Sequence, residues 1–282
     1  MAAPETPTRP TALVIGCGDL GTEVGLRLAA HGETVLGLRR RVEVLPPQIH
    51  GLSVDLTRDR PQLPDGDVRL VAVILTPDAR DEEGYRRTYV GGLTRALDAL
   101  DERGIAPDRA VLVSSTGVYG DLVGDLDEDT PPAPSSGTQQ VLLEAEELFA
   151  DRVGGTVLRL SGMYGPGRDT FITKACDAAV TQRWTNRIHR DDAAAAVVHL
   201  LTAPAQPSSL YLGTDTAPVP SLEVADFIRA ERGLPPHPGA REPIPPGRRL
   251  HSTRLRDRFS FTYPTYREGY RAVLAGAGER HP

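Results

Sequence analysis

The chain has 282 residues, of which 39% are hydrophobic, and a formal net charge of −6 at pH 7. This length and apolar content allow a substantial core, and we expect one large domain with a small appended lobe. The negative charge, with arginines scattered among acidic residues, argues against a nucleic-acid partner.

Residues 1–10 lack the apolar centre of a signal peptide, and no later stretch is long and apolar enough to span a bilayer. We therefore expect a cytoplasmic protein with no membrane partner. Cys17 and Cys176 suggest neither a disulfide framework nor a metal-ligand spacing, and the seven histidines show no paired-ligand pattern. Both thiols should be reduced, and no metal is expected.

The first predicted element is a strand that runs into a glycine-rich turn and then a helix near residues 20–30. Residues 11–21 read Thr-Ala-Leu-Val-Ile-Gly-Cys-Gly-Asp-Leu-Gly. Glycines in the spacing Gly-x-Gly-x-x-Gly give a tight turn, let the backbone approach a pyrophosphate, and allow the helix to pack on the strand. A plain strand-to-helix turn is the alternative. We predict a dinucleotide site formed by Gly16, Gly18, Asp19, Leu20 and Gly21.

Cys17 lies inside this turn and has two interpretations. A helix N-terminus can lower the pKa of a thiol, which would suit a redox switch, but a small buried filler is the simpler role.

The second strand, residues 34–38, ends at three consecutive arginines. NAD-binding proteins usually place a carboxylate here for the ribose 2′-hydroxyl, whereas a guanidinium suits a 2′-phosphate. We therefore predict NADP as the cofactor, with Arg39 and then Arg40 as phosphate ligands; solvated surface charges are the alternative. After the fourth strand, Thr76 and Pro77 are expected along the cofactor, unless the proline simply ends the strand.

Strand-like and helical patterns alternate along most of the chain. Such alternation predicts an α/β fold with a Rossmann-like doubly wound parallel sheet in the order 3-2-1-4-5-6. The predicted strands are residues 13–16, 34–38, 51–54, 69–75, 110–114 and 156–160. We expect the nucleotide-binding domain over residues 11–162, rejoined by 186–214, and a small C-terminal substrate lobe from 163–185 and 215–282. The smaller elements expected are a helix near 170–182, an Ala-rich helix at 191–201 that Asp191 or Asp192 caps, and a strand at 210–213.

Three segments carry a family resemblance. They are Val-Leu-Val-Ser-Ser-Thr-Gly-Val-Tyr-Gly at 111–120, Leu-Arg-Leu-Ser-Gly-Met-Tyr-Gly-Pro-Gly at 158–167, and Asn-Arg-Ile-His-Arg-Asp-Asp at 186–192. With the glycine motif, the chain resembles the extended and atypical short-chain dehydrogenase/reductases, which include sugar-nucleotide epimerases and dehydratases. The resemblance implies that Asp55 and Leu56 contact adenine and that Ser115 polarises the reacting carbonyl or alcohol.

The resemblance also implies a Tyr-x-x-x-Lys pair for proton transfer, and this chain has none. Counting from Tyr119, Ser136 and Gln140 occupy the expected places, and the single lysine, Lys174, follows Thr170 at that spacing. General acid–base transfer contributes about 100 to 10,000-fold to a rate, so its carrier must be sought elsewhere. The candidates are Tyr119, Tyr164 and His189; wall or core packing for the tyrosines and a backbone hydrogen bond for the histidine are the alternatives.

These observations predict an NADP-binding, epimerase/dehydratase-like oxidoreductase that acts on a small oxygenated metabolite. Ser115 or Thr116 would hold a substrate oxygen, unless these side chains only satisfy backbone groups. Tyr164, Arg187 and residues around Trp184 would face the substrate. The alternatives are a non-catalytic NADP-binding sensor or partner-binding protein, and a redox-neutral isomerase or lyase on the same fold. Helices near 82–102 and 138–150 make a homodimer plausible.

Overall fold

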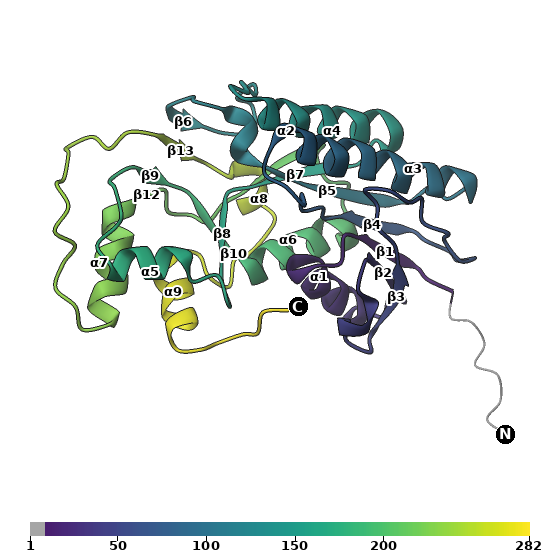
Figure 1. Cartoon of the computed structure of the whole chain (residues 1–282), viewed down its shortest axis with the longest axis horizontal. Helices are drawn as coiled ribbons and strands as arrows, with labels where there is room; N and C mark the ends of the chain where they lie inside the picture. The colour runs from purple at the N-terminus through teal and green to yellow at the C-terminus, as the bar shows by residue number, and fades with distance from the viewer. Residues whose placement is uncertain (1–8) are drawn as a thin grey trace.

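A seven-stranded parallel sheet forms the centre of the molecule, as the computed structural model shows for residues 9–282 (Figure 1). Its order is β3-β2-β1-β4-β5-β7-β11, which confirms the predicted doubly wound order and adds a seventh strand at one edge. The strands are β1 (Ala12–Ile15), β2 (Val35–Arg39), β3 (Ile49–Ser53), β4 (Leu70–Val73), β5 (Arg109–Ser115), β7 (Thr156–Leu160) and β11 (Leu210–Gly213).

Helices cover both faces of the sheet, and each face has its own apolar core. On one face, α1 (Asp19–Ala30) packs beside the Ala-rich α6 (Arg190–Thr202). On the other lie α3 (Leu93–Glu102) and α4 (Gly137–Val153) (Figure 1). The helix predicted over 82–102 is continuous but contains a π-helical segment: α2 (Glu82–Tyr85), η2 (Arg86–Gly92) and then α3.

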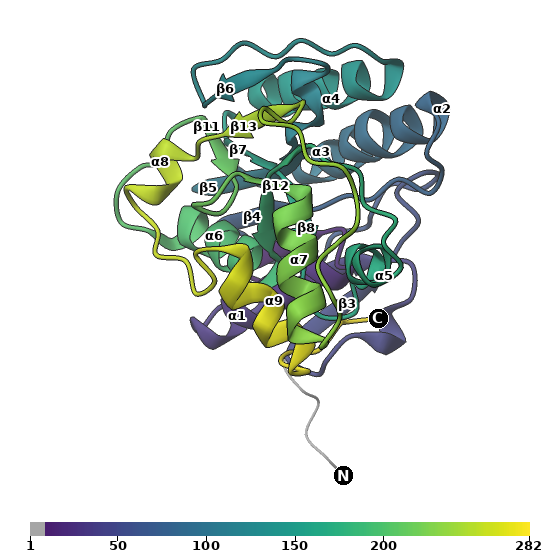
Figure 2. The same ribbon diagram turned by 90° about the vertical axis from the view of Figure 1, so that its left-hand side faces the viewer.

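A smaller lobe with its own apolar cluster stands at the carboxyl ends of the strands. Its helices are α5 (Thr170–Cys176), α7 (Ser221–Glu231) and α9 (Tyr266–Leu274), seen together in Figure 2. Helix α5 ends at Cys176, well before residue 182, and Arg229 donates hydrogen bonds to the free carbonyls of Ala175 and Cys176 at its last turn. The segment from Leu250 to Phe261 packs instead on the cores of the sheet domain.

Short strands connect the lobe to the sheet domain. Strand β8 (Gly162–Tyr164) pairs with β10 (Arg187–His189), β9 (Trp184–Thr185) with β12 (Val219–Pro220), and β6 (Gly124–Leu126) with β13 (Arg248–Leu250). The remaining elements are the 3₁₀ turns η1 (Val42–Val44) and η3 (Thr116–Tyr119) and helix α8 (Thr253–Arg256). No helix within residues 9–282 has the length and apolar character needed to cross a membrane.

The N-terminus of α6 differs from the prediction. Because the helix begins at Arg190, the cap is His189, whose Nδ1 accepts a hydrogen bond of 3.2 Å from the Asp191 backbone N–H. Asp192 lies inside the helix, where its carboxylate accepts hydrogen bonds from the backbone N–H groups of Thr262 and Tyr263. Neither aspartate caps the helix, and Asp192 instead fastens the C-terminal segment.

The apolar residues of α4 are largely used within the chain. Val141, Leu142, Ala145 and Phe149 are buried, and its exposed positions include Gln140 and Glu147. The apolar excess of this helix therefore does not itself require a second subunit, and the homodimer stays a prediction.

Candidate active site

In the glycine-rich turn after β1, the backbone lies very close to neighbouring backbone atoms. Gly16 has a φ of +89°, and a Cβ built on it would lie 2.2 Å from the Ile74 carbonyl oxygen of the neighbouring strand end. A Cβ on Gly21 would lie 2.4 Å from the carbonyl oxygen of Gly16. Only glycine fits at these two positions without a shift of backbone.

Gly18, between them, faces open space. A Cβ on Gly18 would meet no atom of residues 9–282 within 4 Å, and its φ of −85° is open to any residue. Gly18 is also the N-cap of α1, and no side chain of the described residues caps that helix. The first-turn N–H groups of α1, those of Asp19 and Leu20 among them, therefore have no intrahelical acceptor and can bind an anion in front of Gly18.

The two side chains of this turn have structural roles. Cys17 is fully buried against Gly37, and burial raises the pKa of its thiol to about 11, so the buried-filler interpretation is the better one. The carboxylate of Asp19 binds the guanidinium groups of Arg168 and Arg190, at 2.7 and 2.8 Å. Asp19 therefore joins the sheet domain to the lobe through its side chain and can offer an anion only its backbone N–H.

The other predicted cofactor residues follow neighbouring strands at the same edge of the sheet. Arg39 ends β2 and is half-buried, and its Nη1 has no hydrogen-bond partner among residues 9–282. Arg40 is exposed. Asp55 and Leu56 follow β3, where hydrogen bonds from Thr57 lower the pKa of the Asp55 carboxyl. Thr76 and Pro77 follow β4.

A buried ion pair supports the end of β5. Glu146 of α4 accepts hydrogen bonds from Arg159 of β7, the shortest at 2.7 Å, and from the hydroxyl of Ser114. Both members of the pair are about 5% exposed. Arg159 also donates to the hydroxyl of Tyr119, at 3.0 Å. The residues of this network were not among the predicted site residues. The network links the ends of β5 and β7, next to Ser115 and Thr116.

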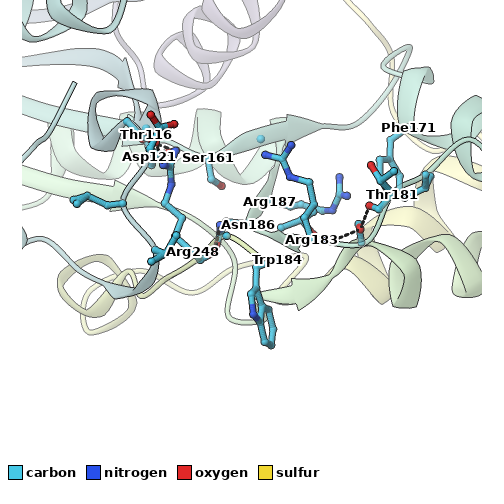
Figure 3. A pocket seen from close by; sticks show the side chains of 18 of the residues that line it. Thr116, Asp121, Ser161, Phe171, Thr181, Arg183, Trp184, Asn186, Arg187 and Arg248 are labelled. Atoms are coloured by element: carbon cyan, nitrogen blue, oxygen red, sulfur yellow. Dashed lines mark hydrogen bonds between the residues drawn. The ribbon is translucent and has the colours of Figure 1, made fainter. Parts of the chain in front are cut away.

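A cavity of about 700 Å³ opens where β5 and β7 end (Figure 3). It lies between the sheet domain and the lobe, and Thr116 is the one predicted catalytic residue that lines it. Ser115 instead accepts a hydrogen bond from the Gly117 backbone N–H. The other polar or charged residues of the lining are Asp121, Gln139, Ser161, Lys174, Thr181, Arg183, Trp184, Thr185, Asn186, Arg187, Ser221 and Arg248.

The three predicted proton carriers are buried in the protein core and do not line the cavity. Tyr119 is fully buried, and burial raises the pKa of its hydroxyl. Tyr164 is stacked on Tyr270 with ring centres 4.5 Å apart, and burial raises its pKa strongly. Burial lowers the pKa of His189 to about 4, so this helix cap is neutral at pH 7. Their surroundings match the packing and backbone roles that were the alternatives.

The positions where the resemblance places the Tyr-x-x-x-Lys pair hold no proton carrier in this chain. Ser136 and Gln140 are exposed and do not line the cavity, whereas Gln139 does. The prediction overlooked Arg183 and Arg248 as cavity residues, and it noted Lys174 only as the single lysine. Arg248 reaches the cavity because β13 pairs with β6, and it donates to the carbonyls of Gly120 and Thr116. No local motif marks such a residue.

These features define a dinucleotide-binding type of α/β fold with a substrate-sized cavity beside the nucleotide edge. Residues 12–213 match the NAD dependent epimerase/dehydratase family, and the chain belongs to that family. The structure of the chain superposes with a TM-score of 0.80 on that of a candidate NAD-dependent epimerase/dehydratase from Methylobacillus flagellatus. That protein is 35% identical, and the match covers 95% of this chain and 99% of that one.

Two curated relatives match at lower coverage. Protein YeeZ of Escherichia coli strain K12 is 30% identical over 203 residues, which are 68% of this chain and 73% of YeeZ. The dTDP-6-deoxy-L-talose 4-dehydrogenase (NAD(P)(+)) of Kitasatospora kifunensis is 30% identical over 183 residues, 60% of this chain and 57% of that enzyme.

Proposed function

We propose that this protein is an NADP-dependent oxidoreductase or epimerase that acts on a small oxygenated metabolite. The observation that carries the proposal is the open space in front of Gly18, beside an uncapped helix N-terminus and a cavity at the end of β5. The family of the chain, whose description names NAD, supports a nicotinamide dinucleotide as the cofactor.

The protein residues fit such a cofactor. The pyrophosphate would bind the first-turn N–H groups of α1, and Asp55, at the end of β3, would lie on the adenine side. The nicotinamide would supply a hydride donor or acceptor beside the cavity. Within that cavity, Thr116 is placed to hold a substrate oxygen, because its buried side chain is part of the lining.

Preference for NADP rests on Arg39. Its Nη1 is buried without a partner in the part of the chain that the structure describes, and leaving a buried donor unsatisfied costs about 1–3 kcal/mol. A ribose 2′-phosphate would satisfy that donor and neutralise the charge. The name of the Kitasatospora dehydrogenase includes both cofactors, so it does not itself favour one.

The proton step differs from the family pattern. The lining contains no tyrosine and no histidine; apart from arginines, its titratable side chains are Asp121 and Lys174. These two are the proton carriers we propose to test, by Asp121→Asn and Lys174→Met, once a substrate is known. Tyr119, Tyr164 and His189 would serve in packing and hydrogen bonding.

Calorimetric titration with NADPH and NADH, on the wild type and on Arg39→Ala, tests the proposal. We expect tighter binding of NADPH, and loss of about tenfold or more of that affinity in the variant, because a charge-assisted hydrogen bond contributes about 1.5–3 kcal/mol. Arg41→Ala, an exposed neighbour, is the matched control. Equal affinity for both cofactors in the wild type would refute the NADP preference, and no binding of either would refute the enzyme.

A non-catalytic NADP sensor remains the second candidate, because the Tyr-x-x-x-Lys pair is absent. The open cavity beside Thr116 favours the enzyme, since a sensor needs no substrate-sized space there. A redox-neutral isomerase or lyase would be recognised by turnover without a net change in nicotinamide absorbance.

A further inference from the structure

Residues 276–282, which we call the strap, run from the end of helix α9 to the first turn of α1 (Figure 1). Gly276 and Gly278 have φ values of +78° and +79°, in the left-handed region that lets the chain turn away from α9. Residues 277–282 form neither helix nor strand. The position of the strap is therefore set by its contacts with other segments of the chain.

The strap contacts α1 through two acidic side chains that lie one helical turn apart. The backbone N–H of His281 donates to Oδ1 of Asp19 at 3.2 Å, and its ring Nε2 lies 2.9 Å from Oε2 of Glu23. The side chains of His281 and Glu23 are only 14% and 17% exposed. Because Asp19 is the first residue of α1, the strap is attached to the turn whose free N–H groups are the proposed pyrophosphate ligands.

On its other side, the strap packs against the turn that follows β8. Arg280 donates from Nη1 to the carbonyl of Gly167 at 2.8 Å, and a Cβ on Gly167 would lie 2.6 Å from Cδ of Arg280. A Cβ on Gly278 would lie 2.7 Å from Cγ of Pro166. The strap therefore bridges the start of α1 and the turn after β8.

Two guanidinium groups connect the strap to the same carboxylate. Buried Arg190 donates from Nη1 to Asp19 at 2.8 Å and from Nη2 to the carbonyl of Glu279, in the strap, at 2.7 Å. Arg168 donates to the other carboxylate oxygen of Asp19 at 2.7 Å. Asp19 thus accepts hydrogen bonds from three segments of the chain. The two positive charges also offset the repulsion that this carboxylate would exert on an anion at the same helix end.

The strap can leave its position without disturbing the apolar cores. Within residues 9–282, no residue of the strap belongs to an apolar cluster, and Glu279 and Arg280 are exposed. Polar contacts near the surface contribute little each, so a segment held by them can open locally while the core stays folded. The strap therefore has two accessible states, docked on α1 and released.

We propose that the strap regulates the cofactor site, docking more firmly when cofactor is bound, with Arg280 and His281 as positioning residues for the first turn of α1. The docked strap holds this turn through Asp19 and Glu23, so a cofactor that binds the N–H groups of the turn has less freedom to remove. Docking and cofactor binding then support each other, and such coupling is reciprocal. This rests on the proposed function, because it concerns the same cofactor site, but it applies to NADPH and NADH alike.

Variants of the strap measure the coupling by calorimetry with whichever of NADPH and NADH the wild type binds more tightly. Arg280→Ala/His281→Ala removes the side-chain contacts of the strap and should weaken binding by about fivefold or more, the lower end of typical coupling between two sites. His281→Gln, whose amide can still donate to Glu23, should bind more tightly than His281→Ala. Glu279→Ala is the matched control and should bind as the wild type does, because within residues 9–282 only the backbone carbonyl of Glu279 contacts another segment, and its side chain is exposed.

Hydrogen exchange of the strap supplies a second readout, on the unmodified protein. Mass spectrometry of a peptide that contains residues 276–282 measures how fast the strap amides exchange, with and without saturating cofactor. The cofactor should slow this exchange by a factor similar to the loss of affinity in the double variant, because the coupling is reciprocal. A strap that only stabilised the fold would not respond to the cofactor. If the double variant does not fold, as urea unfolding without cofactor would show, exchange in the wild type still decides.

Three results would overturn the coupling in a protein that binds the cofactor. They are equal or higher affinity in the double variant, strap exchange that the cofactor does not change, and a loss of affinity in Glu279→Ala as large as in the double variant. Higher affinity would mean that the strap obstructs the site. If the wild type binds neither NADPH nor NADH, the proposed function is refuted together with the coupling, whereas the three results overturn the coupling alone.

Discussion

Replacing Glu146 by glutamine would remove one charge from the buried pair that supports the active-site strands. The substitution keeps the size of the side chain but leaves the Arg159 guanidinium without its counter-ion. Arg159 makes three hydrogen bonds with this carboxylate, of 2.7, 3.1 and 3.1 Å, and the pair is nearly inaccessible to water. Water therefore cannot replace the negative charge and the hydrogen bonds that the carboxylate gives to Arg159.

Breaking a buried ion pair by removing one partner costs about 3–5 kcal/mol, a large part of the stability of 5–15 kcal/mol typical of a domain. The same helix offers a matched control in Glu144, which pairs with Arg86 at 2.8 Å but is exposed. Exposed pairs contribute only about 0–1 kcal/mol. Glu146→Gln should thus destabilise the protein several times more than Glu144→Gln does.

Urea unfolding followed by circular dichroism, with linear extrapolation, measures both variants. A third protein, Glu146→Leu with Arg159→Met, replaces the pair by apolar side chains and should recover most of the loss. If Glu146→Gln and Glu144→Gln cost the same, or if the double variant is no more stable than Glu146→Gln, the reasoning from an uncompensated buried charge is refuted.

Three further predictions concern single positions. Gly18→Ala should unfold at the wild-type temperature, because its Cβ meets no atom, yet bind NADPH about tenfold more weakly by calorimetry; unchanged affinity would place the pyrophosphate elsewhere. Burial raises the pKa of Asp215 to about 7 from 3.8, so the folded state holds a proton that the unfolded chain releases, and stability should fall as pH rises between those values. In urea unfolding, the free energy of unfolding of Asp215→Asn relative to the wild type should rise by up to about 4 kcal/mol from pH 4 to pH 8. A difference between the two proteins that does not change with pH would contradict this. Burial lowers the pKa of His189 from 6.5 to about 4, so the unfolded chain binds the extra proton and stability should fall as pH drops through that window, by up to about 3 kcal/mol. His189→Asn, which can still cap α6, should lose that part of the pH dependence.

The features that could be predicted from the sequence are those set by residues close to one another along the chain. The strand order and the Gly16 turn follow from alternating periodicity and from a local spacing of glycines, and the structure bears out the fold. The prediction of the α6 cap was wrong for two reasons. A small shift in where a helix starts changes which residue caps it, and His189 is a less common cap than aspartate. The positive cavity was only partly foreseen: Arg187 was predicted on the substrate side, whereas Arg248 arrives through strand pairing across more than a hundred residues.

The charge of the cavity also bears on whether the absence of the Tyr-x-x-x-Lys pair means a loss of function. Of the four cations that line the cavity, only Arg187 is buried, whereas Lys174 and Arg183 are exposed. Burial and then the neighbouring charge of Arg183 lower the pKa of Arg248, and the charge of Asp121 opposes that shift. Contacts such as the Phe171 ring over Arg187 orient these groups but do not neutralise them. Positive side chains around an open space favour binding of an anionic molecule, which a bound substrate explains more simply than a loss of function does.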